Sequence, residues 1–187
     1  MGRTSTIDET AVFAAVGQAL SSAGSVTLQS VVAATGVSIG SLYHRYESRE
    51  GLLAATWLDA VSAFQVAFNT AWEHPVERAG EEAALTTPRF CRAERARAIV
   101  LSCCRQSEFL SSSTPEALRQ QIATVNDDGA NALRRFARSS GLGIELCRHA
   151  IVGVPLGIVR AYLPSRPVPA RADDYVRKAY RALTEVV

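Results

Sequence analysis

The apolar residues of this chain recur at the three- and four-residue spacing of amphipathic helices. Within residues 8–23, the side chains of Val12, Val16 and Leu20 fall on one face of a helix. Apolar positions then continue along residues 48–72, which predicts a helix of much greater length. The pattern indicates an all-α protein with about nine helices.

Prolines, glycines and short polar stretches divide the rest of the chain into further predicted helices. The one over 94–110 is apolar almost all round, so we expect it to be central. Pro155 lies in the middle of an apolar stretch, where it predicts a kink rather than an end. These further helices are expected over residues 75–87, 94–110, 115–139, 145–163 and 173–187.

Residues 27–50 predict two short helices joined by a tight turn, followed by the start of a third helix. Gly36 suits the turn because glycine adopts a positive φ without a Cβ clash. Ser38 can cap the second short helix, and Ser48 can cap the long helix that follows. This arrangement is typical of a helix-turn-helix that binds DNA.

The second short helix has one apolar face and one small, polar face. Leu42 and Tyr46 are four residues apart and share the inner face. On the outer face, Ile39 can contact a thymine methyl group and Gly40 allows close approach of the backbone. Ser41 can form a single hydrogen bond to a base. The pattern predicts that the first turn of this helix enters a major groove.

The neighbouring polar side chains have distinct expected roles. Gln29 can bind adenine through two hydrogen bonds, and Tyr43 and His44 can reach phosphate oxygens. Arg49 follows the Ser48 cap, where a cation and free backbone N–H groups suit a phosphate. The predicted DNA-binding residues are Thr27, Gln29, Ser38, Ile39, Gly40, Ser41, Tyr43, His44 and Arg49.

The run GVSIGSLYHRYESREGLL resembles the recognition-helix signature of the tetracycline-repressor (TetR) family, and the resemblance extends over residues 12–53. Three positions depart from the usual pattern: Val32 replaces a small alanine, Tyr46 a phenylalanine and Arg49 a lysine. The alternative interpretation is an ordinary three-helix cluster in an all-α protein.

The resemblance implies a transcriptional regulator, usually a repressor, that binds double-stranded operator DNA and is released by a small-molecule effector. It implies a helix-turn-helix DNA-binding domain over residues 1–53 and a helical effector-binding and dimerisation domain over 54–187. The last two helices, 145–163 and 173–187, would form the homodimer; a core within one chain is the alternative.

The charge distribution changes the expected strength of DNA binding. The 187 residues carry a net charge of +2, but residues 1–55 have three cations, Arg3 among them, against four anions, a net charge of −1. Because counterion release scales with the phosphates neutralised, we expect modest affinity for each protomer and a need for dimerisation. No apolar run has the length of a membrane span, and the N-terminal residues lack the apolar stretch of a signal peptide. We therefore expect a cytoplasmic protein that does not associate with a membrane.

The cysteines and histidines offer two other functions. Cys91, Cys103, Cys104 and Cys147 show no C-x-x-C spacing, and the three histidines form no recognisable catalytic or metal-binding pattern. We therefore expect no enzyme activity, no metal and no cofactor. A cysteine-dependent enzyme and a redox- or thiol-responsive regulator on the same scaffold are the alternatives.

The effector site is expected among the helices at 57–72, 94–110 and 115–139. Side chains with apolar bulk and a few polar tips suit such a site, although each also suits an ordinary core. The absence of lysine from the middle of the chain favours a neutral or weakly polar molecule. The candidate effector-binding residues are Phe64, Phe68, Trp72, Phe90, Cys103, Phe109, Asn126 and His149.

Overall fold

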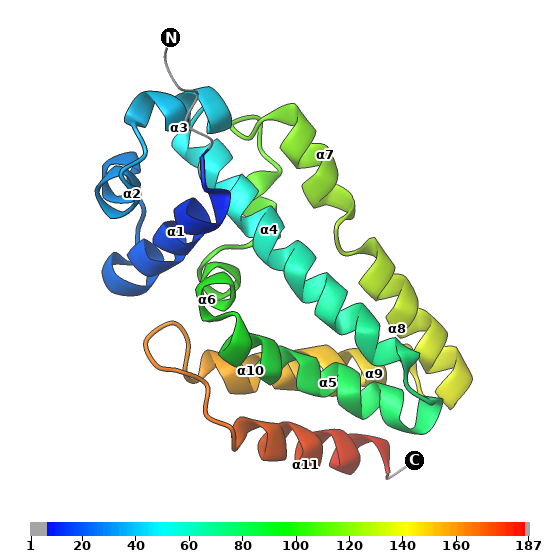
Figure 1. Ribbon diagram of the computed structural model, residues 1–187. Coiled ribbons are helices and arrows are strands. Elements are labelled where there is room, and N and C mark those ends of the chain that lie inside the picture. The colour runs from blue at the N-terminus through cyan, green and yellow to red at the C-terminus, as the bar shows by residue number, and fades with distance from the viewer. Residues whose placement is uncertain (1–6, 186–187) are drawn as a thin grey trace.

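The computed structural model describes residues 7–185, and this part of the chain is helical without a strand (Figure 1). Short 3₁₀ segments at Ala71–Glu73 and Gln106–Phe109 and a π-helical turn at His149–Gly153 join some of the α-helices. The all-α fold class is confirmed. The α-helices are α1 (Glu9–Ala23), α2 (Leu28–Thr35), α3 (Ile39–Tyr46), α4 (Arg49–Thr70), α5 (Val76–Ala93), α6 (Arg95–Cys103), α7 (Glu116–Thr124), α8 (Asp127–Ser140), α9 (Ile144–Arg148), α10 (Val154–Arg160) and α11 (Ala172–Thr184).

The long helix α4 connects the two ends of the molecule (Figure 1). The helices α1, α2 and α3 gather around its beginning, while α5, α9, α10 and α11 lie at the other end. Helices α7 and α8 run alongside α4, and α6 packs against both α4 and α1. Residues 49–73 are long and apolar enough to cross a membrane by those two criteria, but half of the most apolar stretch is buried by other helices.

Three predicted helix boundaries differ from the structure. Helix α5 does not end near Pro88 but continues through it to Ala93. Pro88 itself is buried, as are Leu85 and Phe90, and the burial of this stretch offsets a proline cost of about 3 kcal/mol. Tertiary packing therefore outweighs the tendency of proline to end a helix at this position.

The other two differences shorten one predicted helix and divide another. The helix expected over 94–110 stops at Cys103, after which Cys104 is extended and a 3₁₀ turn carries Phe109 back against Trp57. The helix expected over 115–139 is divided between α7 and α8 by a two-residue turn at Val125 and Asn126.

The stretch predicted as a kinked helix over 145–163 stays helical through Pro155. A π-helical turn precedes the proline, and such a turn accommodates a residue that cannot continue the regular hydrogen-bond pattern. The last helix, α11, ends at Thr184. Residues 186 and 187 of the predicted range 173–187, and Arg3 of the N-terminal segment, lie outside the described residues.

One apolar core crosses the proposed boundary at residue 53. It contains Val16 of α1, Leu52 of α4 and Val100 of α6, and extends to Leu163 beyond α10. Helices α1 and α6 approach so closely that a Cβ at Gly17 would lie 2.8 Å from the carbonyl oxygen of Ala96. The first three helices are therefore packed on α6 as well as on α4.

Candidate nucleic-acid interface and ligand pockets

The turn between α2 and α3 has the geometry that the sequence predicts. Gly36 has φ 71°, in the left-handed region, and its N–H donates to the carbonyl oxygen of Val32 at 2.9 Å. No atom lies within 4 Å of the position a Cβ would take, so the requirement for glycine is conformational rather than steric. The predicted hinge at Gly36 is confirmed.

Hydroxyl side chains cap the N-termini of α2, α3 and α4. Ser38 Oγ accepts a hydrogen bond from the Ser41 N–H at 3.1 Å, and Ser48 Oγ accepts one from the Gly51 N–H at 2.9 Å, as predicted. Thr27 forms a reciprocal capping box with Ser30 at the start of α2. These caps fix where each helix begins and therefore which side chains face outward.

The two faces of α3 divide as predicted. Leu42 and Tyr46 are buried, whereas Ile39 is 41% exposed and Tyr43 51% exposed. His44, Gly40 and Gln29 are also exposed. The Ser41 hydroxyl lies 2.9 Å from the Ser38 hydroxyl. These two predicted DNA-binding side chains therefore form a hydrogen bond with each other.

The two arginines described at this end already bind neighbouring groups. Arg49 Nε donates to the carbonyl oxygen of Val26 at 2.6 Å, and its Nη1 lies 3.2 Å from Glu50 Oε1. Arg45 Nε donates to Glu9 Oε1 at 2.9 Å. Arg49 thus joins the start of α4 to the segment before α2, and Arg45 joins α3 to α1.

Glu9 also accepts a hydrogen bond from the Tyr46 hydroxyl at 3.3 Å. Burial, together with the nearby Glu9 carboxylate, raises the pKa of Tyr46 above its ordinary value, which keeps the phenol protonated. Sequence reasoning missed the role of Glu9, because residues 36 positions apart leave no local pattern.

Four of the predicted effector-binding residues meet in the structure. Phe64 stacks on Phe68 with ring centroids 5.8 Å apart, Phe68 meets the edge of Trp72 at 5.3 Å, and Phe64 meets the edge of Phe90 at 5.4 Å. These rings form a row that follows α4 into the 3₁₀ segment after it, and Phe90 adds a ring from α5.

The other four lie elsewhere. Phe109 packs on Trp57, and Cys103 and His149 are exposed. Asn126 Oδ1 accepts a hydrogen bond from Gln65 Nε2 at 2.7 Å, so its amide joins α4 to the turn before α8.

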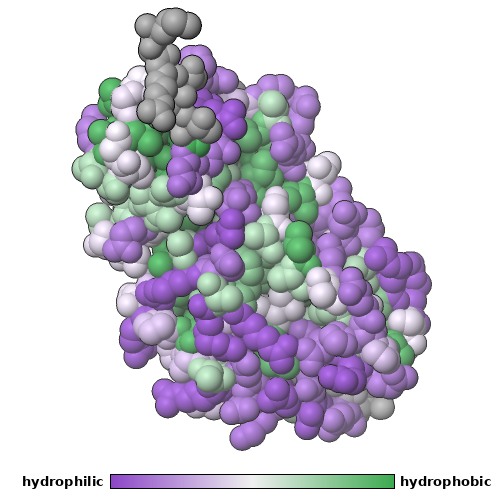
Figure 2. Space-filling model, viewed as in Figure 1, coloured by the Kyte–Doolittle hydropathy of each residue, from purple (hydrophilic) through white to green (hydrophobic). Residues whose placement is uncertain are grey.

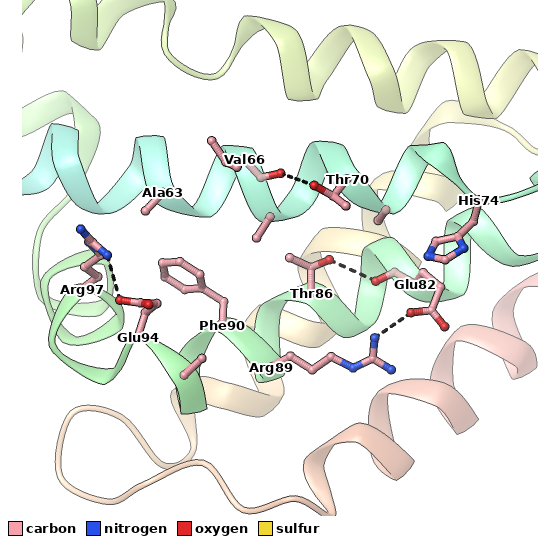
Figure 3. Close-up of a pocket in the computed structure, with 13 residues that line it drawn as sticks. Ala63, Val66, Thr70, His74, Glu82, Thr86, Arg89, Phe90, Glu94 and Arg97 are labelled. Atoms are coloured by element: carbon pink, nitrogen blue, oxygen red, sulfur yellow. Dashed lines mark hydrogen bonds and ion pairs between the residues drawn. The ribbon is translucent and has the colours of Figure 1, made fainter.

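A groove of about 470 Å³ lies between α4 and α5 (Figure 3). Figure 2 shows apolar side chains along α4 and mostly hydrophilic ones over α5 and α11. Arg89 Nη1 lies 2.6 Å from Glu82 Oε2, and this hydrogen bond lowers the pKa of Glu82. Arg97 binds both Glu94 and Asp59 at 2.8 Å. The opposite charges of the groove are therefore paired with one another.

A second cavity of about 150 Å³ is lined by residues of α4, α5, α6, α10 and the segment after α10. Phe64 and Phe90 contribute to its wall. The expected cavity between 57–72, 94–110 and 115–139 thus differs in one wall, because α5 and α10 take the place that the sequence suggested for α7 and α8.

The buried thiols have little thiolate character. Burial raises the pKa of Cys91 and of Cys104 to about 11, and it also raises the pKa of Cys147. Since the thiolate is the reactive form, burial disfavours oxidation or nucleophilic attack at these three residues. Within residues 7–185, no three His, Cys, Asp or Glu side chains gather in a way that could hold a metal ion.

Comparisons with known proteins agree with this geometry. Residues 22–56 match the family model described as bacterial regulatory proteins, tetR family. No curated protein matches the chain.

Solved structures with the same fold cover nearly the whole chain. The TetR family transcriptional regulator PfmR from Thermus thermophilus has a TM-score of 0.72 and 17% identity over 93% of this chain and 97% of its own. The fatty acid degradation regulator FadR from Bacillus halodurans has a TM-score of 0.71 and 17% identity, covering 97% of both chains. A putative tetR family regulator from Shewanella sp. PV-4 has a TM-score of 0.67 and 18% identity over 97% of this chain and 98% of its own.

The resemblance read from the recognition helix is therefore confirmed, and it coincides with the residues that form the capped turn. The segment that matches the tetR family model contains the capped turn between α2 and α3, and the fold of the whole chain is similar to that of solved TetR family transcriptional regulators.

Proposed function

We propose that this protein is a homodimeric, operator-specific repressor that a small-molecule effector releases from DNA. The observation that carries the proposal is the capped helix-turn-helix of α2 and α3, whose outer face is exposed. The boundary between the DNA-binding and effector domains is proposed at residues 53 and 54, within α4. A cytoplasmic location follows from the same function.

Exposed side chains of α2 and α3 supply the DNA contacts in this proposal. Gln29 and Ile39 read base edges, and Tyr43 and His44 hold phosphates. Arg49 has two of its guanidinium nitrogens hydrogen-bonded within the protein, so its contribution to phosphate binding comes from the third nitrogen and from its charge.

The dimer would use the outer face of α9 and α10 together with α11. Val152 is 39% exposed and Tyr175 is 47% exposed, both large apolar side chains open to a partner. A Cβ at Gly157 would meet no atom within 4 Å, so this glycine leaves room for the backbone of a second copy. Two recognition helices must lie about 34–36 Å apart to enter successive major grooves, which makes the dimer geometry decisive.

Contacts between the end of α10 and the first helix provide a path for release. Arg95 of α6 donates to the carbonyl oxygens of Pro164 and Arg166, each at 3.0 Å. Ser21 of α1 donates to the same Pro164 oxygen at 3.5 Å. An effector that displaces α10 would therefore move α6 and α1. If it binds this displaced arrangement more tightly than the DNA-binding arrangement, it lowers DNA affinity by the ratio of its two affinities.

Selection from a pool of random double-stranded DNA tests the proposal. The full-length protein should enrich a two-fold symmetric site whose half-sites are about one helical turn apart. Gln29→Ala and Ile39→Ala should change the selected bases, because both side chains are exposed and are not needed for folding. Tyr43→Phe should weaken binding to every sequence alike. A pool that shows no enrichment after repeated rounds contradicts the proposal.

A further inference from the structure

The smaller cavity is lined almost entirely by apolar side chains. Phe64 comes from α4, Phe90 from α5, Leu101 from α6, and Leu156 and Val159 from α10. The rings of Phe64 and Phe90 meet edge to face, with an interplanar angle of 88°. An apolar cavity of about 150 Å³ is large enough to hold one benzene molecule. The walls therefore fit a single aromatic ring, which gains further from contacts with the edges and faces of neighbouring rings.

Two polar groups of the lining have no partner of their own. Among residues 7–185, neither the Arg160 guanidinium nor the Thr87 hydroxyl forms a hydrogen bond, and Arg160 forms no ion pair. The third polar lining residue, Ser102, donates to the carbonyl oxygen of Ile99 at 2.8 Å. An anion in the cavity could therefore bind the guanidinium of the exposed Arg160 and the hydroxyl of the buried Thr87.

The nearby arginines differ from Arg160 in this respect. Arg92 binds Asp173 through two hydrogen bonds of 2.8 and 2.9 Å, and Arg97 binds Asp59 and Glu94. The larger groove between α4 and α5 also has its charges paired internally. Arg160 is consequently the cation that an incoming carboxylate can bind without breaking an existing ion pair.

We propose that this cavity binds a monocyclic aromatic carboxylate of about the size of benzoate. The ring lies against Phe64 and Phe90, and the carboxylate binds the Arg160 guanidinium, which suits a carboxylate through paired N–H donors. This assignment rests on the proposed function, since it names the effector of the regulator. It replaces the neutral molecule expected from the sequence, because Arg160 gives the site a charge.

The position of the site links it to release from DNA. Leu156 and Arg160 lie on α10, a helix that also carries the proposed dimer surface, and Leu163 at its end shares the apolar core with α1. A ring inserted beneath α10 changes how this helix rests on α5 and α6. The same ligand therefore acts on the dimer surface and on the first helix.

Calorimetric titration of the full-length protein with benzoate, and with benzamide as its neutral isostere, tests the site. We expect benzoate to bind about tenfold more tightly than benzamide, the difference expected for one hydrogen bond to a charged group. In Arg160→Gln the two ligands should bind equally, because Arg160 is exposed and its loss leaves the cavity unchanged. Arg148→Gln, which removes an exposed charge from the same helical stretch, should keep the tenfold preference.

Filling the cavity is the second arm of this test. Ala98→Leu should abolish binding of both ligands, because Ala98 lines the cavity and is buried. Should Ala98→Leu fail to fold, Arg160→Gln alone still decides the matter. The assignment is overturned if benzoate does not bind at millimolar concentration, if Arg160→Gln retains the preference, or if folded Ala98→Leu binds benzoate as well as the wild type does.

Measurement of DNA binding on the same samples separates this assignment from the proposed function. If the protein selects an operator but does not bind benzoate, the ligand assignment fails and the DNA-binding function stands. If benzoate binds through Arg160 but no DNA is selected, the cavity is as assigned and the regulatory function fails. If benzoate binds and lowers operator affinity in the wild type but not in Arg160→Gln, both stand.

Discussion

The two ends of the molecule are held together by different kinds of interaction. Around α2 and α3, the hydrogen bonds of the caps and of the turn join residues no more than four positions apart, as in the Ser38 cap and the Gly36 turn. Longer contacts add to them, such as those from Arg45 to Glu9 and from Arg49 to Val26. Around α5 and α11, they join residues 81 to 100 positions apart, as where Glu81 lies 3.1 Å from Arg177 and 3.0 Å from Arg181. The capped turn between α2 and α3 is thus specified locally, whereas the end at α5 and α11 depends on how distant helices meet.

This difference predicts which substitutions act on one helix and which act on the assembly of several. A change at a local turn should lower stability by the strain at that residue. A change at a contact between helices should shift whole elements. Four substitutions, in order of decreasing expected effect, test the contrast.

The largest effect is expected from a charge on the proposed dimer surface. Gly157→Glu should leave the protomer folded, because a Cβ there meets no neighbour, but should turn the dimer into monomers. An unpaired charge buried in the interface costs several kcal/mol. Sedimentation at micromolar concentration checks this; Gly157→Ala, the small control, should remain dimeric, and a wild-type monomer contradicts the prediction.

A contact between distant helices should be the next most sensitive position. Gly17→Val places a Cβ 2.8 Å from the backbone oxygen of Ala96, so α1 and α6 must separate. We expect the free energy of unfolding to fall by about 3 kcal/mol. Chemical denaturation measures it, with Gly40→Ala as the control because the nearest atom to its Cβ position is 3.9 Å away. Equal stability of the two variants is the result that contradicts the close approach.

The local turn should respond less. Gly36→Val should lower the free energy of unfolding by about 2 kcal/mol, because a β-branched residue at φ 71° is strained. Gly36→Asn should cost less, since asparagine tolerates the left-handed region. Thermal unfolding and operator binding are the measurements. Full DNA binding and an unchanged melting temperature in Gly36→Val contradict the assigned turn.

The smallest effect is expected at the ion pair between α1 and α3. Arg45→Gln removes an exposed pair with Glu9, and such surface pairs contribute little to stability because solvent screens them. Its stability should therefore remain close to that of the wild type in a denaturant titration. A loss larger than that of Gly36→Val would show that the capped turn between α2 and α3 also depends on long-range contacts.

The residues that the sequence predicts correctly are those whose environment lies within one helical turn. Gly36 as the hinge, Ser38 and Ser48 as caps, and the burial of Leu42 and Tyr46 all follow from short spacing along the chain. The helical class follows from the same periodicity, because each amphipathic stretch repeats it.

The residues that the sequence does not predict depend on partners far away in the chain. Pro88 stays within a helix because its surroundings are buried. The break before α8 coincides with two hydrogen bonds of Asn126, which accepts from Gln65 and donates to Gln106. That Arg160 has no ion-pair partner within residues 7–185 becomes visible only when the contacts of the surrounding side chains are known. No local rule gives these arrangements, since they require the packing itself.

Because Gly17 lies so close to Ala96, the first three helices could not be exchanged freely between related proteins by recombination. A chimera that joins residues 1–53 of this chain to the remainder of a relative would set Gly17 against the backbone of a foreign helix in place of the Ala96 backbone. Ser21 would likewise lose its acceptor at Pro164. A functional chimera therefore has to take α6 and the segment after α10 from the same protein as the first three helices, although neither of them contacts DNA in our proposal.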